Sequence, residues 1–145
     1  SLGADEVVQY SKQDFYKVFK SNKEGQDIDL ILDMIGGDYF EKNIGLLNEE
    51  GRLVNIAFLK GNSVKLDLSK LMMKRINLTG STLRPRTTEF KSKIAEELRE
   101  IIWPLLNTQK IRVHVDSIFP LEKFRDAHIR MESGNHLGKI ILSLD

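Results

Sequence analysis

The first half of the chain alternates short apolar runs with segments in which apolar residues recur every three or four positions. The runs at residues 6–10, 28–35 and 53–58 are typical of strands, and segments 11–19 and 38–47 have the periodicity of amphipathic helices. The run at 28–35 is almost continuously apolar, which indicates a strand buried on both faces of a parallel sheet. This alternation predicts an α/β fold whose parallel sheet carries helices on both sides.

The second half continues the alternation. Residues 67–75 have the pattern of a short amphipathic helix, and residues 76–82 alternate in a way that suits a strand at a sheet edge or between subunits. A long helix follows over 88–105, with a kink near Glu100 because Pro104 removes the donor for that carbonyl. The last expected elements are a strand at 113–119, a helix from Pro120 to Gly134 and a strand at 139–142.

Capping residues and glycines predict where these elements begin and end. Ser11, Asp38 and Thr88 are typical helix N-caps. Gly3 resembles the glycine that ends a helix, yet almost no chain precedes it. We therefore expect a fragment or excised domain whose partner segment lies upstream, and a short disordered terminus is the alternative.

Composition narrows the class of protein. The chain has 145 residues, 41% of them hydrophobic, which fits one folded domain rather than a disordered chain. Its net charge of +1 argues against a nucleic-acid partner. The absence of cysteine excludes disulfides, thiolate zinc sites and a cysteine nucleophile. No apolar run approaches the roughly 20 residues that span a bilayer, so we expect a cytoplasmic protein without a membrane partner.

Candidate binding residues follow three of the predicted strands. The turn Gly36-Gly37-Asp38 follows one strand, and residues 57–59 and 81–83 follow two others that run the same way. In open α/β sheets, ligands bind beyond the carboxyl ends of strands. The glycine turn taken alone fits an ordinary tight turn equally well. Three strand ends at one edge favour a binding site there.

Other polar residues offer weaker evidence of chemistry. His128 falls on the apolar stripe of its helix, which predicts a packed histidine rather than a catalytic base. Asp29 and Asp33 flank a strand, where cap or loop contacts explain them as well as acid–base work does. Arg84 and Arg86 belong to a local basic cluster that suits an anionic cofactor or an ordinary solvated surface.

Several motifs resemble medium-chain dehydrogenases/reductases. Residues 1–10 match LGAD-x-V-x-x-Y, residues 31–37 end in D-x-x-G-G, and residues 51–54 read G-R-L-V. LTGSTLR at 78–84, with AH-x-x-MESG and GKI between 127 and 140, resembles the zinc-independent NADPH:quinone oxidoreductases, the zeta-crystallin-like branch. The resemblance runs nearly end to end and keeps its order.

This resemblance implies a domain organisation and a cofactor. Residues 1–110 would be the C-terminal part of a Rossmann-type NAD(P)-binding domain, and residues 111–145 a C-terminal segment of the catalytic domain. The N-terminal catalytic domain and the glycine-rich fingerprint would lie upstream. The implied NADPH contacts are Tyr10 at the adenosine 2′-phosphate, Ile35 and Gly36 at the ribose and pyrophosphate, Ala57, Phe58, Leu59, Ser81, Thr82 and Leu83 at the nicotinamide, and Gly134 and Asn135 near the 2′-phosphate.

The implied activity is that of an NADPH-dependent quinone oxidoreductase. In this branch the cofactor supplies the hydride chemistry, so we assign no catalytic side chain and no metal ligand here. We expect the chain alone to bind NADPH weakly, to be inactive, and to form a homodimer through the strand Ile76–Thr82. The alternatives are a 2-enoyl thioester reductase, a zinc-type alcohol dehydrogenase fragment, or a non-catalytic oligomerisation module.

Overall fold

The computed structural model describes residues 3–21 and 28–144. The chain divides into two compact units, Ser1–Pro85 and Arg86–Asp145. The boundary expected at residue 110 concerns the domains of a whole enzyme and stays a prediction. The polar loop at residues 22–26 lies outside the described residues.

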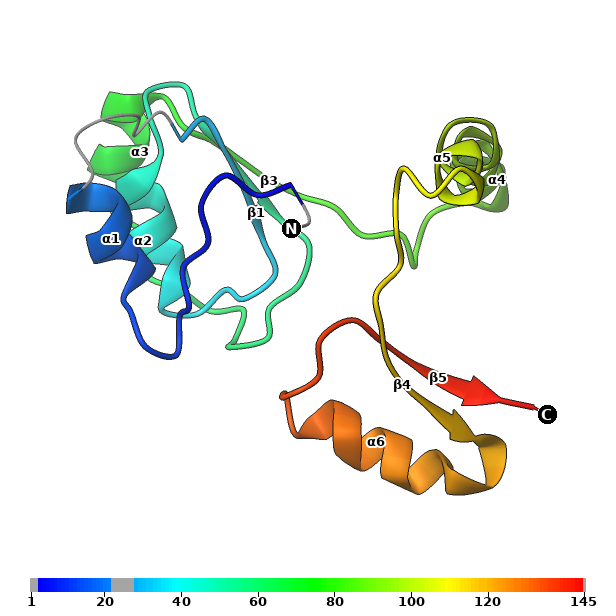
Figure 1. Ribbon diagram of the computed structural model, residues 1–145. Helices are drawn as coiled ribbons and strands as arrows, with labels where there is room; N and C mark the ends of the chain where they lie inside the picture. The colour runs from blue at the N-terminus through cyan, green and yellow to red at the C-terminus, as the bar shows by residue number, and fades with distance from the viewer. Residues whose placement is uncertain (1–2, 22–27, 145) are drawn as a thin grey trace. The chain divides into compact units, whose positions relative to one another are not determined.

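The first unit contains a three-stranded parallel sheet (Figure 1). Its strands lie in the order β1-β2-β3, and Leu53 of β2 is in register with Ile31 of β1 and Leu78 of β3. The α/β class with a parallel sheet is confirmed. The bounds are β1 Leu30–Asp33, β2 Arg52–Asn55, β3 Asn77–Gly80, α1 Phe15–Ser21, α2 Tyr39–Leu46 and α3 Leu68–Lys74.

The core of this unit forms where α2 packs on the sheet. Phe40 and Ile44 of α2 meet Leu53 of β2, together with Leu47 and Ile76. Leu53 is 0% exposed, and full burial of such a side chain stabilises the fold by about 1.5–3 kcal/mol. Phe40, Ile44 and Leu47, whose periodic spacing predicted an amphipathic helix, therefore face the core.

The opposite face of the sheet is open within this unit, which corrects the expectation of burial on both faces. Leu30 is 62% and Leu32 61% exposed. The three helices gather on the other face of the sheet, as Figure 1 shows. An apolar run alone cannot show whether both of a strand's faces find a covering layer.

Three local predictions in the first unit were wrong. Residues 6–10 form no strand, because no neighbouring strand among the described residues pairs with them. The first helix begins at Phe15 rather than after Ser11, since Asp14 Oδ1 accepts the Tyr16 N–H at 3.0 Å. Asp38 precedes α2 but makes no capping hydrogen bond with its side chain.

The second unit begins with a helix that changes its pitch. It runs as α4 (Thr88–Glu97), a π-helical turn η1 (Leu98–Ile102) and α5 (Trp103–Asn107). The Trp103 N–H reaches back five residues to the Leu98 carbonyl. The kink expected near Glu100 because of Pro104 is therefore replaced by a wider, π-helical turn. The N-cap of α4 is Thr87, one residue before the predicted Thr88. The Thr87 side-chain hydroxyl oxygen accepts a hydrogen bond from the Phe90 N–H.

The chain ends in a strand–helix–strand motif. Strands β4 (Val115–Pro120) and β5 (Lys139–Ser143) pair in parallel, and η2 (Leu121–Lys123) and α6 (Phe124–Glu132) connect them. Pro120 ends β4 instead of starting the helix. His128 is exposed on α6 rather than packed, because Ala127 is the buried residue of that helix.

Candidate functional site

The carboxyl ends of β1, β2 and β3 lie at one edge of the sheet. The Ile56 N–H donates to the Asp33 carbonyl at 2.8 Å, and the Ser81 N–H donates to the Asn55 carbonyl at 3.0 Å. These two bonds continue the strand pairing into the loops. The segments predicted to follow three parallel strands therefore begin side by side.

The carboxylate of Asp33 accepts hydrogen bonds from several groups at this edge. Its side chain is buried, and Oδ1 accepts the N–H groups of Ile35 at 2.7 Å and Gly36 at 3.2 Å. Its Oδ2 accepts the Asn55 side-chain amide at 3.1 Å, so one carboxylate joins the ends of β1 and β2. Of the two interpretations of Asp33, the structure favours loop contacts over acid–base work.

The two glycines after β1 are required by the neighbouring loop. Gly36 and Gly37 have φ of +65° and +54°, where side chains are strained. A Cβ at Gly36 would lie 2.6 Å from the Gly61 carbonyl oxygen, and one at Gly37 would lie 2.6 Å from that of Lys60. Close packing of the loop after β2 explains this turn without a ligand.

Backbone hydrogen bonds fasten the same two loops together. Lys60 N–H donates to the Ile35 carbonyl at 2.8 Å, and Gly37 N–H donates to the Gly61 carbonyl at 3.0 Å. Residues 57–59 are thereby held beside the turn after β1. Phe58 and Leu59 remain exposed, so their side chains are available at this edge.

Two hollows lie beside this edge, and Tyr10 lines both of them. The first, of about 310 Å³, also includes Ile35 and is mostly apolar and aromatic. The structure therefore brings together two of the residues that the sequence predicted as cofactor contacts. The lining residues of this hollow that carry rings or amides are Tyr10, Phe15, Phe19, Tyr39 and Asn43.

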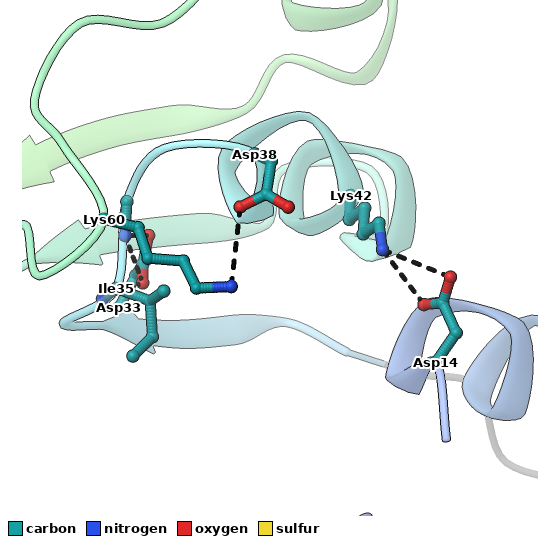
Figure 2. A network of polar contacts seen from close by, with 7 residues as sticks. Asp14, Asp33, Ile35, Asp38, Lys42 and Lys60 are labelled. Carbon is teal, nitrogen blue, oxygen red and sulfur yellow. Dashed lines mark hydrogen bonds and ion pairs between the residues drawn. The ribbon is translucent and has the colours of Figure 1, made fainter. Parts of the chain in front are cut away.

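The second hollow, of about 300 Å³, is rich in charge. It is lined by Lys12, Lys42 and Lys60, with Asp14 and Asp38 between them. Figure 2 shows two of these lysines paired with the aspartates: Lys42 with Asp14 at 3.1 Å, and Lys60 with Asp38 at 4.0 Å. The hydrogen bond from Lys42 is the largest cause of a lowered pKa of Asp14.

No sequence pattern indicates that these lysines belong to a binding site. They come from three segments that are far apart along the chain, and none belongs to a motif. An aromatic contact also holds Lys60, whose ammonium lies 4.7 Å from the centre of the Tyr39 ring. Only the folded arrangement shows that these side chains share one hollow.

The remaining residues predicted to contact the cofactor lie after β3 and after α6. Ser81, Thr82 and Leu83 follow β3 and are exposed. Gly134 and Asn135 belong to the second unit, where Gly134, at φ +66°, follows the end of α6. Their roles toward a cofactor stay predictions.

Metal ligands do not gather in the part of the chain that the structure describes. No group of three His, Asp or Glu side chains in residues 3–21 and 28–144 could hold a metal ion. The donor set of these residues therefore does not fit a zinc centre. In the same ranges, no helix has the length and apolar character needed to cross a bilayer.

A parallel sheet with loops gathered at its carboxyl edge is the architecture in which dehydrogenases bind dinucleotides. The chain belongs to the zinc-binding dehydrogenase family, whose model matches residues 2–142. This family and the presence of quinone oxidoreductase-like relatives confirm the resemblance described above.

Relatives and solved structures match nearly the whole chain. The mouse quinone oxidoreductase-like protein 2 is 27% identical over 143 residues, covering 98% of this chain and 40% of its own length. The lovastatin diketide synthase of Aspergillus terreus is 26% identical over 145 residues, covering 99% of this chain and 6% of its own length. The chain thus spans less than half the length of these relatives.

Two solved structures show the same fold. The Escherichia coli quinone oxidoreductase complexed with NADPH is 25% identical, with a TM-score of 0.75 over 97% of this chain and 43% of that one. The cobalt- and zinc-bound thermostable alcohol dehydrogenase from Pyrobaculum aerophilum is also 25% identical, with a TM-score of 0.69 over 97% of this chain and 37% of that one.

Proposed function

We propose that this chain corresponds to the C-terminal part of an NADPH-dependent quinone oxidoreductase of the cytoplasm that works without zinc. Such an enzyme transfers a hydride from NADPH to a quinone or to another activated alkene or carbonyl. The observation that carries the proposal is the fold match to the Escherichia coli quinone oxidoreductase complexed with NADPH. The quinone oxidoreductase-like relatives support the same acceptor class.

The residues at the carboxyl edge fit a dinucleotide in their chemistry. Tyr10 offers a hydroxyl and a ring beside a lysine-lined hollow, which suits a ribose that carries a phosphate. Ile35 and Gly36 present the turn after β1 to the ribose and pyrophosphate. When bound, the nicotinamide supplies the hydride, and the protein orients it. We assign the nicotinamide contacts to Ala57, Phe58, Leu59, Ser81, Thr82 and Leu83 of this unit.

A second candidate is a 2-enoyl thioester reductase. The match to the lovastatin diketide synthase is the observation that favours it. Both candidates use the same cofactor edge and differ in the acceptor. A zinc-type alcohol dehydrogenase is a third candidate, and the match to the cobalt- and zinc-bound enzyme from Pyrobaculum aerophilum is the observation that favours it.

The proposal is tested by titrating the chain with NADPH and following amide resonances by NMR. We expect shifts at Tyr10, at residues 35–38 and at residues 57–59, with a dissociation constant in the roughly millimolar range because few contacts are fixed. NADPH oxidation with a quinone should be absent for the chain alone. Shifts confined to other surfaces would refute the assigned edge, and micromolar binding would refute the expected weak affinity.

A further inference from the structure

The loop after β2 holds Asn62 and Ser63 without hydrogen bonds. Both residues are exposed, and residues 61–67 belong to no helix or strand. Among the residues that the structure describes, neither of the two takes part in a hydrogen bond, through its backbone or its side chain. The preceding Gly61 has φ of +111°, and nothing lies within 4 Å of the position that its Cβ would take. The side chain of Asn62 and the backbone N–H that follows it are therefore uncrowded.

Freedom of this kind exposes an asparagine to a reaction within its own chain. The backbone nitrogen of the following residue can attack the side-chain Cγ and close a five-membered ring. Such an intramolecular attack is fast when the two atoms can reach the reactive geometry, since no second molecule has to be brought into place. A hydrogen bond from the attacking N–H, a bonded side-chain amide or a bulky following residue opposes that geometry.

The eight asparagines of the chain differ in these restraints. Only Asn62 is followed by serine or glycine, and the other seven precede larger side chains that shield the backbone nitrogen. Asn55 is the opposite case, because its side-chain amide donates to Asp33 at 3.1 Å. The next N–H, that of Ile56, donates to the Asp33 carbonyl at 2.8 Å. None of these restraints acts on Asn62.

We propose that Asn62 is a site of spontaneous deamidation. The backbone nitrogen of Ser63 bonds to Cγ of Asn62, and the bond from Cγ to the side-chain amide nitrogen breaks. The proton of the attacking N–H leaves with that amide as ammonia. Water then opens the ring at Cγ to give aspartate, or at the backbone carbonyl to give isoaspartate, whose main chain runs through Cβ and Cγ. The reaction needs water alone and does not depend on the proposed function.

The position of Asn62 gives the reaction a structural consequence. The carbonyl of the preceding Gly61 accepts the Gly37 N–H at 3.0 Å, and the Lys60 N–H donates to the Ile35 carbonyl at 2.8 Å. Isoaspartate adds one carbon atom to the main chain directly after this contact. It also adds a carboxylate two residues from Lys60, whose ammonium Figure 2 shows turned toward Asp38. Deamidation therefore loosens the contact between the two loops at the carboxyl edge.

The site is tested by incubating the chain in mildly alkaline buffer and digesting it with trypsin. Cleavage after Lys60 and Lys65 releases residues 61–65 as one peptide. We expect its mass to rise by the difference between OH and NH₂ about tenfold faster than that of any other asparagine-containing peptide. Aspartate and isoaspartate products should separate by chromatography. Faster loss of ammonia at another asparagine, or an unchanged peptide, would overturn the proposal.

Two variants test the ring closure itself. Ser63→Val keeps Asn62 but shields the attacking nitrogen with a branched side chain, so the reaction should slow about tenfold. Asn62→Gln keeps the amide but needs a larger ring, so the peptide should keep its mass. An equal rate in Ser63→Val would show that Ser63 N is not the nucleophile.

Hydrogen exchange of the Gly37 N–H tests the loosening of the loops. We expect faster exchange in the incubated chain than in the fresh one, because the accepting carbonyl of Gly61 is displaced. Asn62→Asp is the matched control, since it adds the charge without lengthening the main chain and should leave this exchange slow. Unchanged exchange after incubation would overturn the structural consequence, and neither result bears on dinucleotide binding.

Discussion

Gly36 has a backbone conformation and a neighbour that both oppose a side chain. Its φ is +65°, and an added Cβ would lie 2.6 Å from the Gly61 carbonyl oxygen. That oxygen is already fixed by the Gly37 N–H at 3.0 Å, so it cannot move away freely. We expect Gly36→Ala to lower the free energy of unfolding by about 1–3 kcal/mol, measured by urea denaturation.

Gly134→Ala is the control that tests backbone strain without a close contact. Gly134 has φ of +66°, almost the same as Gly36, and nothing lies within 4 Å of the position that its Cβ would take. This variant therefore carries a similar backbone strain without the contact. If Gly134→Ala proves as destabilising as Gly36→Ala, then close packing between the two loops contributes nothing measurable.

Single residues differ in how well the sequence revealed their roles. The loop contacts of Asp33 were one of two interpretations, and a carboxylate directly after an apolar strand is a local signal. The lysines of the second hollow had no such signal. Residues 12, 42 and 60 share an environment only because α1, α2 and the loop after β2 pack together.

At the scale of elements, Asp116 joins three parts of the last motif. Its carboxylate accepts Arg130 Nη2 from α6 at 2.8 Å and the Leu137 N–H before β5 at 3.0 Å, and Asp116 itself lies in β4. These groups, with Arg130 first, hold the pKa of Asp116 well below its ordinary value of 3.8. The stability from this carboxylate is thus present above that value and is lost as the pH falls below it.

We expect Asp116→Asn to lower the stability of this motif at neutral pH and to flatten its dependence on pH below about 4. Circular dichroism during urea unfolding at a series of pH values measures both effects. Asp5→Asn is the control, because Asp5 is exposed and lies in the other unit. An acid dependence as steep in Asp116→Asn as in the unmodified chain would show that another carboxyl group dominates.

The order of the elements could be predicted from periodicity, while their partners could not. Strands β1 and β2 follow from apolar runs bounded by glycine, and α2 follows from residues that became the core. The run at residues 6–10 has the same local character, yet it lacks a neighbouring strand to pair with. Pairing and face coverage depend on distant segments, which local patterns do not describe.

For the molecule as a whole, the edge of β3 is where we expect copies of the chain to associate, because its outer side pairs with no other described strand. β3 pairs only with β2 among the described strands, which agrees with the edge position predicted for residues 76–82. The Asn77 and Ser81 N–H groups point toward β2, to Gly51 and Asn55. Because these directions alternate along a strand, the N–H of Leu78 points away from the sheet.

We expect the chain to form a homodimer through this edge, with the strands of two copies related by a two-fold axis. Such pairing also protects an edge that is otherwise open to uncontrolled strand addition. Leu78→Pro removes an outward donor and leaves the bonds from Asn77 and Ser81 to β2 in place, so it should yield a folded monomer.

Light scattering in the micromolar range, combined with circular dichroism, tests this prediction. Leu78→Lys is a second variant that keeps the N–H but places a charge on the edge, and it should weaken the dimer without removing β3. Met72→Lys, on the exposed surface of α3, is the control for added charge and should remain dimeric. A monomeric unmodified chain, or a dimer that survives both changes at Leu78, would place any self-association elsewhere on the molecule.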